Sequence, residues 1–118
     1  MTRKEFIQDL EFTLLLLQTL RDSTRRREIY VVANETYVHV LNGNGLNNTD
    51  FNVITPKMGC LAKLFYSRHD AYINGMDYNL KDGAGNKVEL NVIPATDYFS
   101  SVIEITKNMI KHLNIASE

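Results

Sequence analysis

The first twenty residues carry more apolar surface than one packed helix face needs, and this constrains the fold more than any other feature. Thr2 and Glu5 have the spacing of a capping box, so a helix is expected to begin here. One face of this helix consists of Phe6, Leu10, Leu14, Leu17 and Leu20. The face is widened beyond the usual arc of about 100° by Ile7, Phe12 and Leu16. The helix is therefore expected to lie between two layers of the domain or to contact another chain.

Leu15 is the residue of this helix that we expect outside the intramolecular core. It lies among the polar residues Glu11, Gln18 and Asp22. An apolar surface that the domain itself does not cover is typical of a contact with another molecule. The sequence therefore predicts a self-association surface, formed by Phe12, Leu15 and Leu16.

The composition is that of an ordinary globular protein. Of the 118 residues, 44% are hydrophobic and 23% are charged, which predicts one domain over residues 1–118. A net charge of -1 provides no general attraction for polyanions. Asparagine is abundant along the whole chain. Because asparagine codons are AT-rich, we interpret this abundance as a sign of an AT-rich bacterial, phage or mobile-element genome.

We expect the protein to work in a reducing cytoplasm. Cys60 is the single cysteine and has no partner for an intramolecular disulfide. The beginning of the chain lacks the apolar stretch and cleavage site of a signal peptide. The longest apolar run, residues 14–17, is far shorter than the roughly 20 residues of a membrane helix. No membrane segment is therefore expected.

Two pairs of short β-rich segments predict hairpins. Residues 29–32 and 36–41 surround a turn that begins with Asn34, and asparagine tolerates the left-handed conformation of a two-residue turn. Residues 76–80 and 88–92 alternate apolar and polar side chains around a glycine-rich turn. Each pair is expected to form two antiparallel strands.

The second β-rich segment has apolar groups on both faces. One face carries Tyr37, His39 and Leu41, and the other carries Val38 and Val40. We therefore expect layers on both sides of the sheet. A turn-rich loop follows at residues 42–50, and residues 51–54 predict a further short strand.

Two further helices are expected. Thr55 and Pro56 match the N-cap and first position of a helix that runs to about Ser67. Thr96 or Asp97 is expected to cap a last helix. The face of the last helix assigned to the core consists of Tyr98, Val102, Ile105, Met109 and Leu113. The opposite face consists of Glu104, Lys107 and Lys111.

These elements follow one another in the order α-β-β-(β)-α-β-β-α. Hairpin connections favour an antiparallel sheet, and the helices are expected to pack against it. The sequence therefore predicts a small α+β domain. Its antiparallel sheet consists of two hairpins and one extra short strand, and it is packed with three helices.

No pattern in the sequence predicts a cofactor or a metal site. The histidines are His39, His69 and His112. Their positions lack the short spacings of zinc ligands. The glycines within residues 43–45 and 83–85 lack the rest of a nucleotide-binding loop. Cys60 precedes His69 and Asp70, and this order leaves a small cysteine-dependent enzyme as a distant alternative.

One local concentration of charge follows the first helix. It consists of Arg21, Arg25, Arg26 and Arg27, with Tyr30 beside it. Arginines next to an aromatic side chain can bind a nucleic-acid strand by phosphate pairing and base stacking. Arginines at the end of a helix also favour the negative end of its dipole without any partner. The sequence leaves both interpretations open.

From these observations we expect a small non-enzymatic cytoplasmic protein that acts by binding another protein, as a homodimer. An accessory role in a phage or mobile element fits the codon argument. The expectation rests on the wide apolar face of the first helix and on the lack of a catalytic pattern. The alternative is a nucleic-acid-binding module that uses the basic residues 21–27.

Overall fold

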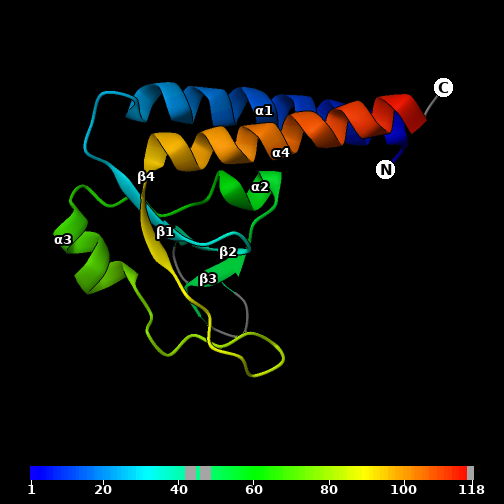
Figure 1. The fold of residues 1–118 in the computed structure, drawn as a ribbon. Helices are drawn as coiled ribbons and strands as arrows, with labels where there is room; N and C mark the ends of the chain where they lie inside the picture. The colour runs from blue at the N-terminus through cyan, green and yellow to red at the C-terminus, as the bar shows by residue number, and fades with distance from the viewer. Residues whose placement is uncertain (42–44, 46–48, 117–118) are drawn as a thin grey trace.

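Two long helices pack side by side along one face of a four-stranded sheet (Figure 1) in a computed structural model that describes residues 1–41, 45 and 49–116. The first helix, α1, spans Arg3–Thr24, and the last helix, α4, spans Ala95–Ala116. At one end of the pair, Arg3 Nη1 donates a hydrogen bond to Ala116 O at 3.1 Å. At the other end, the hydroxyls of Thr24 and Thr96 lie 3.3 Å apart. The two helices are therefore antiparallel and joined near both ends.

The predicted capping box begins α1. The hydroxyl of Thr2 accepts a hydrogen bond from Glu5 N at 3.1 Å and donates one to the Glu5 carboxylate at 3.1 Å. The buried residues of α1 are Leu10, Thr13, Leu17 and Thr24. Phe6, which was assigned to the core face, is instead 36% exposed.

The sheet contains β1 (Tyr30–Ala33), β2 (Tyr37–His39), β3 (Phe51–Val53) and β4 (Asn91–Pro94). Its strand order is β3-β2-β1-β4, and every neighbouring pair is antiparallel. The α+β class, the first hairpin and the extra short strand are thereby confirmed. The predicted loop at 42–50 lies for the most part outside the described residues.

Asn34 shapes the turn between β1 and β2 through its side chain. Asn34 N donates to Tyr37 O at 2.9 Å, which places Glu35 and Thr36 at the centre of the turn. The side-chain carbonyl of Asn34 accepts from Thr36 N at 2.8 Å and from Tyr37 N at 2.7 Å. The prediction placed Asn34 itself within the two-residue turn. In the observed Asx turn, Asn34 is the residue just before the two central residues.

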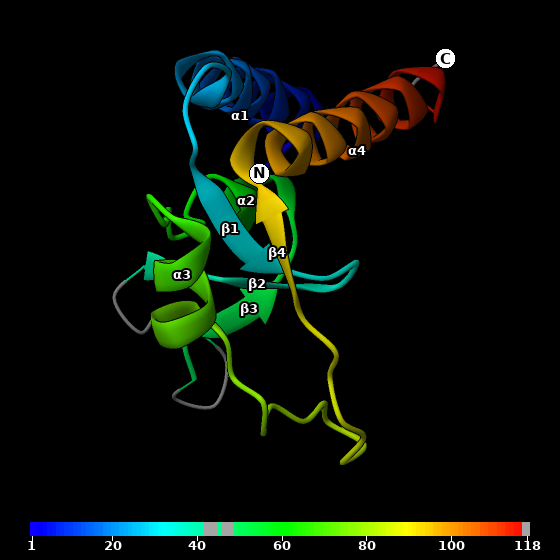
Figure 2. The same cartoon turned by 60° about the vertical axis from the view of Figure 1, so that its left-hand side comes forward.

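Both faces of the sheet are covered, as predicted. The face toward α1 and α4 is formed by Val31, Ala33, Val38 and Val40, which pack with Leu17, Phe99 and Ile103. The opposite face carries Val32 and Phe51, which pack with Phe65, Ala71 and Leu80. Figure 2 shows the short helical segment α3 on the side of the sheet away from the α1–α4 pair. The domain therefore has two apolar clusters separated by one sheet.

The second helix is much shorter than predicted. After the N-cap Thr55, α2 spans only Pro56–Gly59. The chain then becomes extended and pairs with the sheet: Leu41 N donates to Leu61 O at 3.0 Å, and Phe65 N donates to Tyr30 O at 2.8 Å. The periodicity of residues 55–67 was therefore misread. Its apolar side chains pack on both faces of the sheet: Ala62 and Leu64 join the cluster beneath the long helices, and Phe65 joins the opposite cluster.

The predicted hairpin of residues 76–80 and 88–92 is wrong in its first arm. Residues 76–80 form no strand. They follow α3 (Arg68–Asp70) and the π-helical turn η3 (Ala71–Gly75). The arms meet only at the turn, where Asp82 N donates to Asn86 O and Val88 N donates to Leu80 O. The second arm continues into β4 and pairs with β1. Alternating polarity in residues 76–80 thus reflects packing of an irregular segment.

The last helix begins earlier and buries a different stripe than predicted. It begins at Ala95, so Thr96 and Asp97 lie inside its first turn. Its buried residues are Ala95, Tyr98, Phe99, Val102, Ile103 and Thr106. Ile105, which was assigned to the core, is 43% exposed because α4 contacts both α1 and the sheet through a neighbouring face. Glu104, Lys107 and Lys111 are exposed as predicted.

Gly75 provides a test of the packing between the sheet and η3. A Cβ atom at this position would lie 2.7 Å from Phe65 Cζ and 2.7 Å from Val32 Cγ2. We predict that Gly75→Ala lowers the free energy of unfolding by about 1–3 kcal/mol through overpacking. Urea denaturation measures this, with Gly83→Ala as the control because a Cβ there would have no heavy atom within 4 Å. Equal stability of the two variants would contradict the described packing.

Candidate functional site

The outward side of α1 is an exposed apolar surface. Phe12 is 61% exposed, Leu15 62% and Leu16 44%. These three residues, which we call the α1 stripe, are those that the sequence assigned to self-association. The core-facing neighbours Leu10 and Leu17 are buried at 4% and 0% exposure. The stripe is therefore a surface additional to the intramolecular core.

A groove extends this surface toward α2. Phe12 and Leu16 form one wall, and Met58 and Leu61 form the other. The groove has a volume of about 360 Å³, with Asp9 and Lys57 among its polar lining residues. A shallow apolar groove beside exposed leucines is the kind of surface that packs against an apolar helix or loop.

The two long helices are longer than the sheet on which they pack. A helix of 22 residues is about 33 Å long, whereas strands of three or four residues span only about 10–13 Å. Figure 1 shows the end of the α1–α4 pair that holds both termini extending past the sheet. Side chains on this part of the pair have no sheet beneath them.

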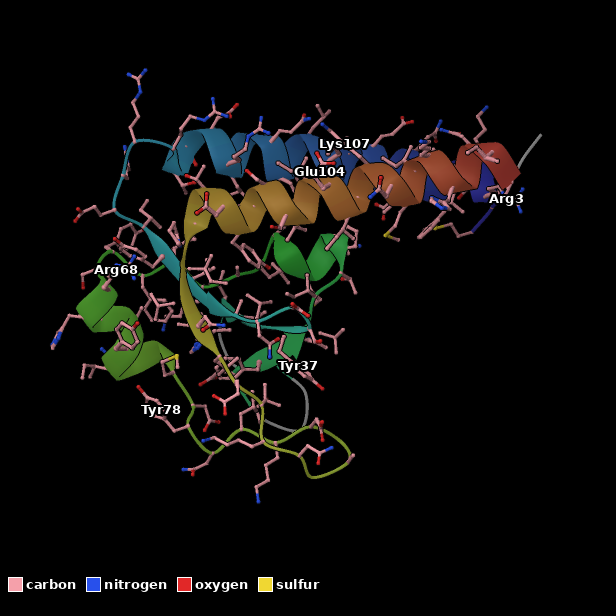
Figure 3. The ribbon with its side chains drawn as sticks, viewed as in Figure 1. Arg3, Tyr37, Arg68, Tyr78, Glu104 and Lys107 are labelled. Carbon is pink, nitrogen blue, oxygen red and sulfur yellow. The ribbon has the colours of Figure 1, made fainter. Side chains whose placement is uncertain are left out.

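The ring of Tyr30 already has a cationic neighbour. Tyr30 packs against the apolar cluster on the face of the sheet opposite α1. The guanidinium carbon of Arg68 lies 4.8 Å from the centre of the Tyr30 ring, and Figure 3 shows Arg68 at α3. Since a cation already covers this ring, Tyr30 is not placed as a stacking platform beside the arginines.

Part of the basic charge is compensated locally. Asp22 Oδ1 lies 3.2 Å from Arg21 Nε and 3.4 Å from Arg25 Nη2. Arg26 and Arg27 are exposed just beyond the end of α1. These two residues and Arg25 are the part of the predicted cluster that an anionic partner can reach.

Cys60 lacks the surroundings of a reactive thiol. Its Sγ donates to Pro56 O at 3.6 Å, and it packs against the cluster between the sheet and the long helices. Burial raises the pKa of the Cys60 thiol, which disfavours the nucleophilic thiolate. His69 lies in α3 on the other side of the sheet. The structure therefore does not bring Cys60 and His69 together.

His39 is the most enclosed ionisable side chain on the α3 side of the sheet. It is 5% exposed, and its ring packs edge-on against Phe51 and Phe65. Its Nδ1 lies 2.8 Å from Gly75 O, so this nitrogen carries the donated proton. Burial lowers the pKa of His39 below its ordinary value. The geometry is that of a neutral histidine that joins η3 to the sheet.

A second cavity lies beneath α4, and the sequence did not predict it. It has a volume of about 410 Å³ and is lined by the β1–β2 turn, β4 and α4. Pro94 is the last residue of β4, and proline in a strand is a sequence signal of a sheet edge. Nearby in α4, Tyr98 is buried, and its hydroxyl has no hydrogen-bond partner among the described residues. Burial raises the pKa of Tyr98.

Comparison with known proteins adds no further information. No family model, curated protein or solved structure matches the chain. Within the described residues, no helix is long and apolar enough to cross a membrane. The same residues contain no group of three or more histidine, cysteine, aspartate or glutamate side chains arranged to hold a metal ion. A role for the chain must therefore be argued from its surfaces.

The buried His39 gives the stability of the fold a predicted pH dependence. Because the pKa of His39 is lowered in the folded state, the unfolded chain binds a proton more readily. We predict that the free energy of unfolding falls as the pH decreases from about 6.5, the ordinary value, through the lowered folded-state pKa. Denaturation between about pH 7.5 and 5 should show a shallower pH slope for His39→Gln than for wild type. His112→Gln is the control, because His112 is exposed. A pH slope for His39→Gln equal to that of wild type would contradict the prediction.

The basic segment has its own test. We predict that replacing Arg25, Arg26 and Arg27 by glutamine changes the free energy of unfolding by no more than about 0.5 kcal/mol. If the three arginines pair with phosphates, affinity for oligonucleotides should fall about 40-fold between 50 and 200 mM salt, and this salt dependence should be lost in the triple variant. Fluorescence anisotropy measures both. Absence of binding at 50 mM salt would eliminate the nucleic-acid alternative.

Proposed function

We propose that this chain is a non-enzymatic protein-binding module that self-associates through the α1 stripe. The observation that carries the proposal is the exposure of Phe12, Leu15 and Leu16, at 44–62%, on a helix whose other side buries Leu10, Thr13 and Leu17. Apolar patches of this kind on otherwise polar surfaces are typical of protein interfaces. A homodimer related by a two-fold axis would bury the stripe of one copy against that of the other.

The groove beside α2 supports the same proposal. Met58 and Leu61 face the groove next to Leu16, so a partner helix lying on α1 would gain apolar contact on two sides. The raised pKa of Cys60 favours packing over catalysis at this position. The proposal includes a reducing cytoplasm as the location, in keeping with one unpaired cysteine, and an accessory role in a phage or mobile element.

Nucleic-acid binding is the second candidate, and the surfaces favour it less. Asp22 pairs with Arg21 and Arg25, and the ring of Tyr30 is covered by Arg68. What supports this candidate is the exposure of Arg26 and Arg27 at one end of α1. Both candidates are compatible with one chain, because the basic segment and the α1 stripe are different surfaces.

The proposal predicts that Leu15→Glu converts a dimer into a folded monomer. A buried carboxylate in an apolar interface is strongly unfavourable, so we expect the dimer dissociation constant to rise more than about tenfold. Sedimentation equilibrium at tens of micromolar measures the change, and circular dichroism shows whether the monomer is folded.

The matched control is Ile73→Glu. Ile73 is 66% exposed, close to the 62% of Leu15, and it lies in η3 rather than in α1. This variant should remain dimeric. A wild type that is monomeric throughout the concentration range, or an equal effect of both substitutions, would contradict the assignment of the α1 stripe.

A further inference from the structure

The border of the sheet at β4 is open. Among the residues that the structure describes, the strand order is β3-β2-β1-β4, so β4 has a paired neighbour on one side only. Figure 2 shows β4 at this border, with α4 above it. Pro94 ends the strand and limits accidental pairing, as is usual at sheet edges. An open edge strand is also a site where an extended peptide can be added to a sheet.

The hydrogen-bond pattern shows which backbone groups the edge offers. Ala95 N donates to Ile29 O, and in an antiparallel ladder every second residue is bonded to the same neighbour. Asn91 and Ile93 are therefore the residues of β4 bonded to β1. Val92 and Pro94 direct their backbone groups outward. Since proline has no N–H, the outward N–H of β4 is that of Val92.

The cavity beneath α4 lies on the helix side of this edge. Asn91 and Ile93 line it from β4, while Val92 packs against the opposite cluster. Val102 and Ile105 line it from α4. A strand added beside β4 would direct every second side chain into this cavity, and an apolar side chain fits its apolar part.

Carboxylates flank the cavity at both ends of β4. Glu35 lies in the β1–β2 turn, next to Asn91, the first residue of β4, since Ala33 pairs with Asn91. Asp97 follows the last residue of β4 by three positions. Both are exposed, and neither forms an ion pair with another described residue. The site is thus apolar in the middle and acidic at its ends.

We propose that the β4 edge binds an extended segment of a partner protein that carries a basic, an apolar and a basic side chain at alternate positions. The outward backbone groups of Val92 and Pro94 would bind the backbone of the segment, the cavity its apolar side chain, and Glu35 and Asp97 its cations. This proposal names a partner for the proposed protein-binding function, and it uses a surface other than the α1 stripe.

Charge favours such a segment over a second copy of the chain. The helix-side residues of β4 are Asn91 and Ile93, which provide no cation. Two copies paired edge to edge through β4 would bring the carboxylates of both copies to one interface, and like charges oppose association. A basic extended segment has no such penalty.

The probe is a fluorescent synthetic peptide, acetyl-Thr-Lys-Thr-Ile-Thr-Lys-Thr-amide. Its two lysines and its isoleucine lie on one side of a strand, and the lysines are about 13 Å apart. The control probe has glutamate in place of both lysines. Anisotropy should show saturable binding of the lysine peptide, and binding of the glutamate peptide that is at least about fivefold weaker.

Three variants assign the binding to this site. Val92→Pro removes the outward N–H without removing a bond to β1, and the double variant Glu35→Lys, Asp97→Lys reverses the charge. Each should weaken binding at least about fivefold. Glu104→Lys is the control, because Glu104 is exposed on α4 (Figure 3) and does not line the cavity. Urea denaturation verifies that each variant is folded, and the charge variant keeps the test valid if Val92→Pro unfolds.

The outcomes separate this proposal from self-association. If the monomeric Leu15→Glu variant still binds the lysine peptide, the result supports the β4 site independently of the α1 interface. No binding of the lysine peptide up to about 1 mM, a weak limit for a specific complex, overturns the β4 proposal and leaves the α1 proposal intact. Binding unaffected by the folded charge variant also overturns it. Loss of the dimer in folded Val92→Pro overturns it in favour of edge pairing between copies.

Discussion

The packing of α1 against α4 is the interaction on which the rest of the structure depends. These helices are the first and last elements of the chain, and they are joined by the Arg3–Ala116 hydrogen bond at one end and by the Thr24–Thr96 contact at the other. Leu17, Phe99 and Ile103 are each no more than 1% exposed. They pack together with the sheet in one cluster. The short strands have few backbone hydrogen bonds of their own, and a small sheet of this kind requires such a cover.

The same packing leaves apolar surface without an internal partner. Two helices of 22 residues are longer than the strands beneath them, so part of each helix extends past the sheet. The short α2 packs against both helices, and a Cβ at its last residue, Gly59, would be 2.7 Å from Val102 Cγ1. The α1 stripe is exposed for a different reason, because it lies on the side of α1 opposite the buried Leu10 and Leu17.

Sequence patterns predicted the long helices and the first hairpin because these elements have local causes. The hydroxyl of Thr2, the side chain of Asn34 and the threonine N-cap at position 55 each act within four residues. The exposure of Leu15 followed from its polar neighbours in the helix. These features depend on spacing that one segment contains, and a single sequence reveals them.

Other parts of the fold depend on contacts between distant segments, and the sequence alone did not reveal them. The extended pairing of Phe65 with Tyr30 replaces most of the predicted second helix. The guanidinium of Arg68 covers the Tyr30 ring, which the sequence offered as a stacking surface for a base. Ile105 belongs to an apolar face by periodicity, yet α4 turns a neighbouring face to the core. The cavity beneath α4 combines a turn, a strand edge and a helix. No pattern within a single segment predicts such a combination.

The central claim is that copies of this chain meet at the α1 stripe, on the outward side of α1. An isotope-filtered NOE experiment on a mixture of methyl-labelled and unlabelled protein tests this contact directly. The account predicts intermolecular NOEs to the methyl groups of Leu15 and Leu16, and none to those of Ile73. Intermolecular NOEs confined to Ile93 and Ile105 would place the contact at the β4 edge, and their complete absence at concentrations of hundreds of micromolar would leave the chain a monomer; either result would contradict the account.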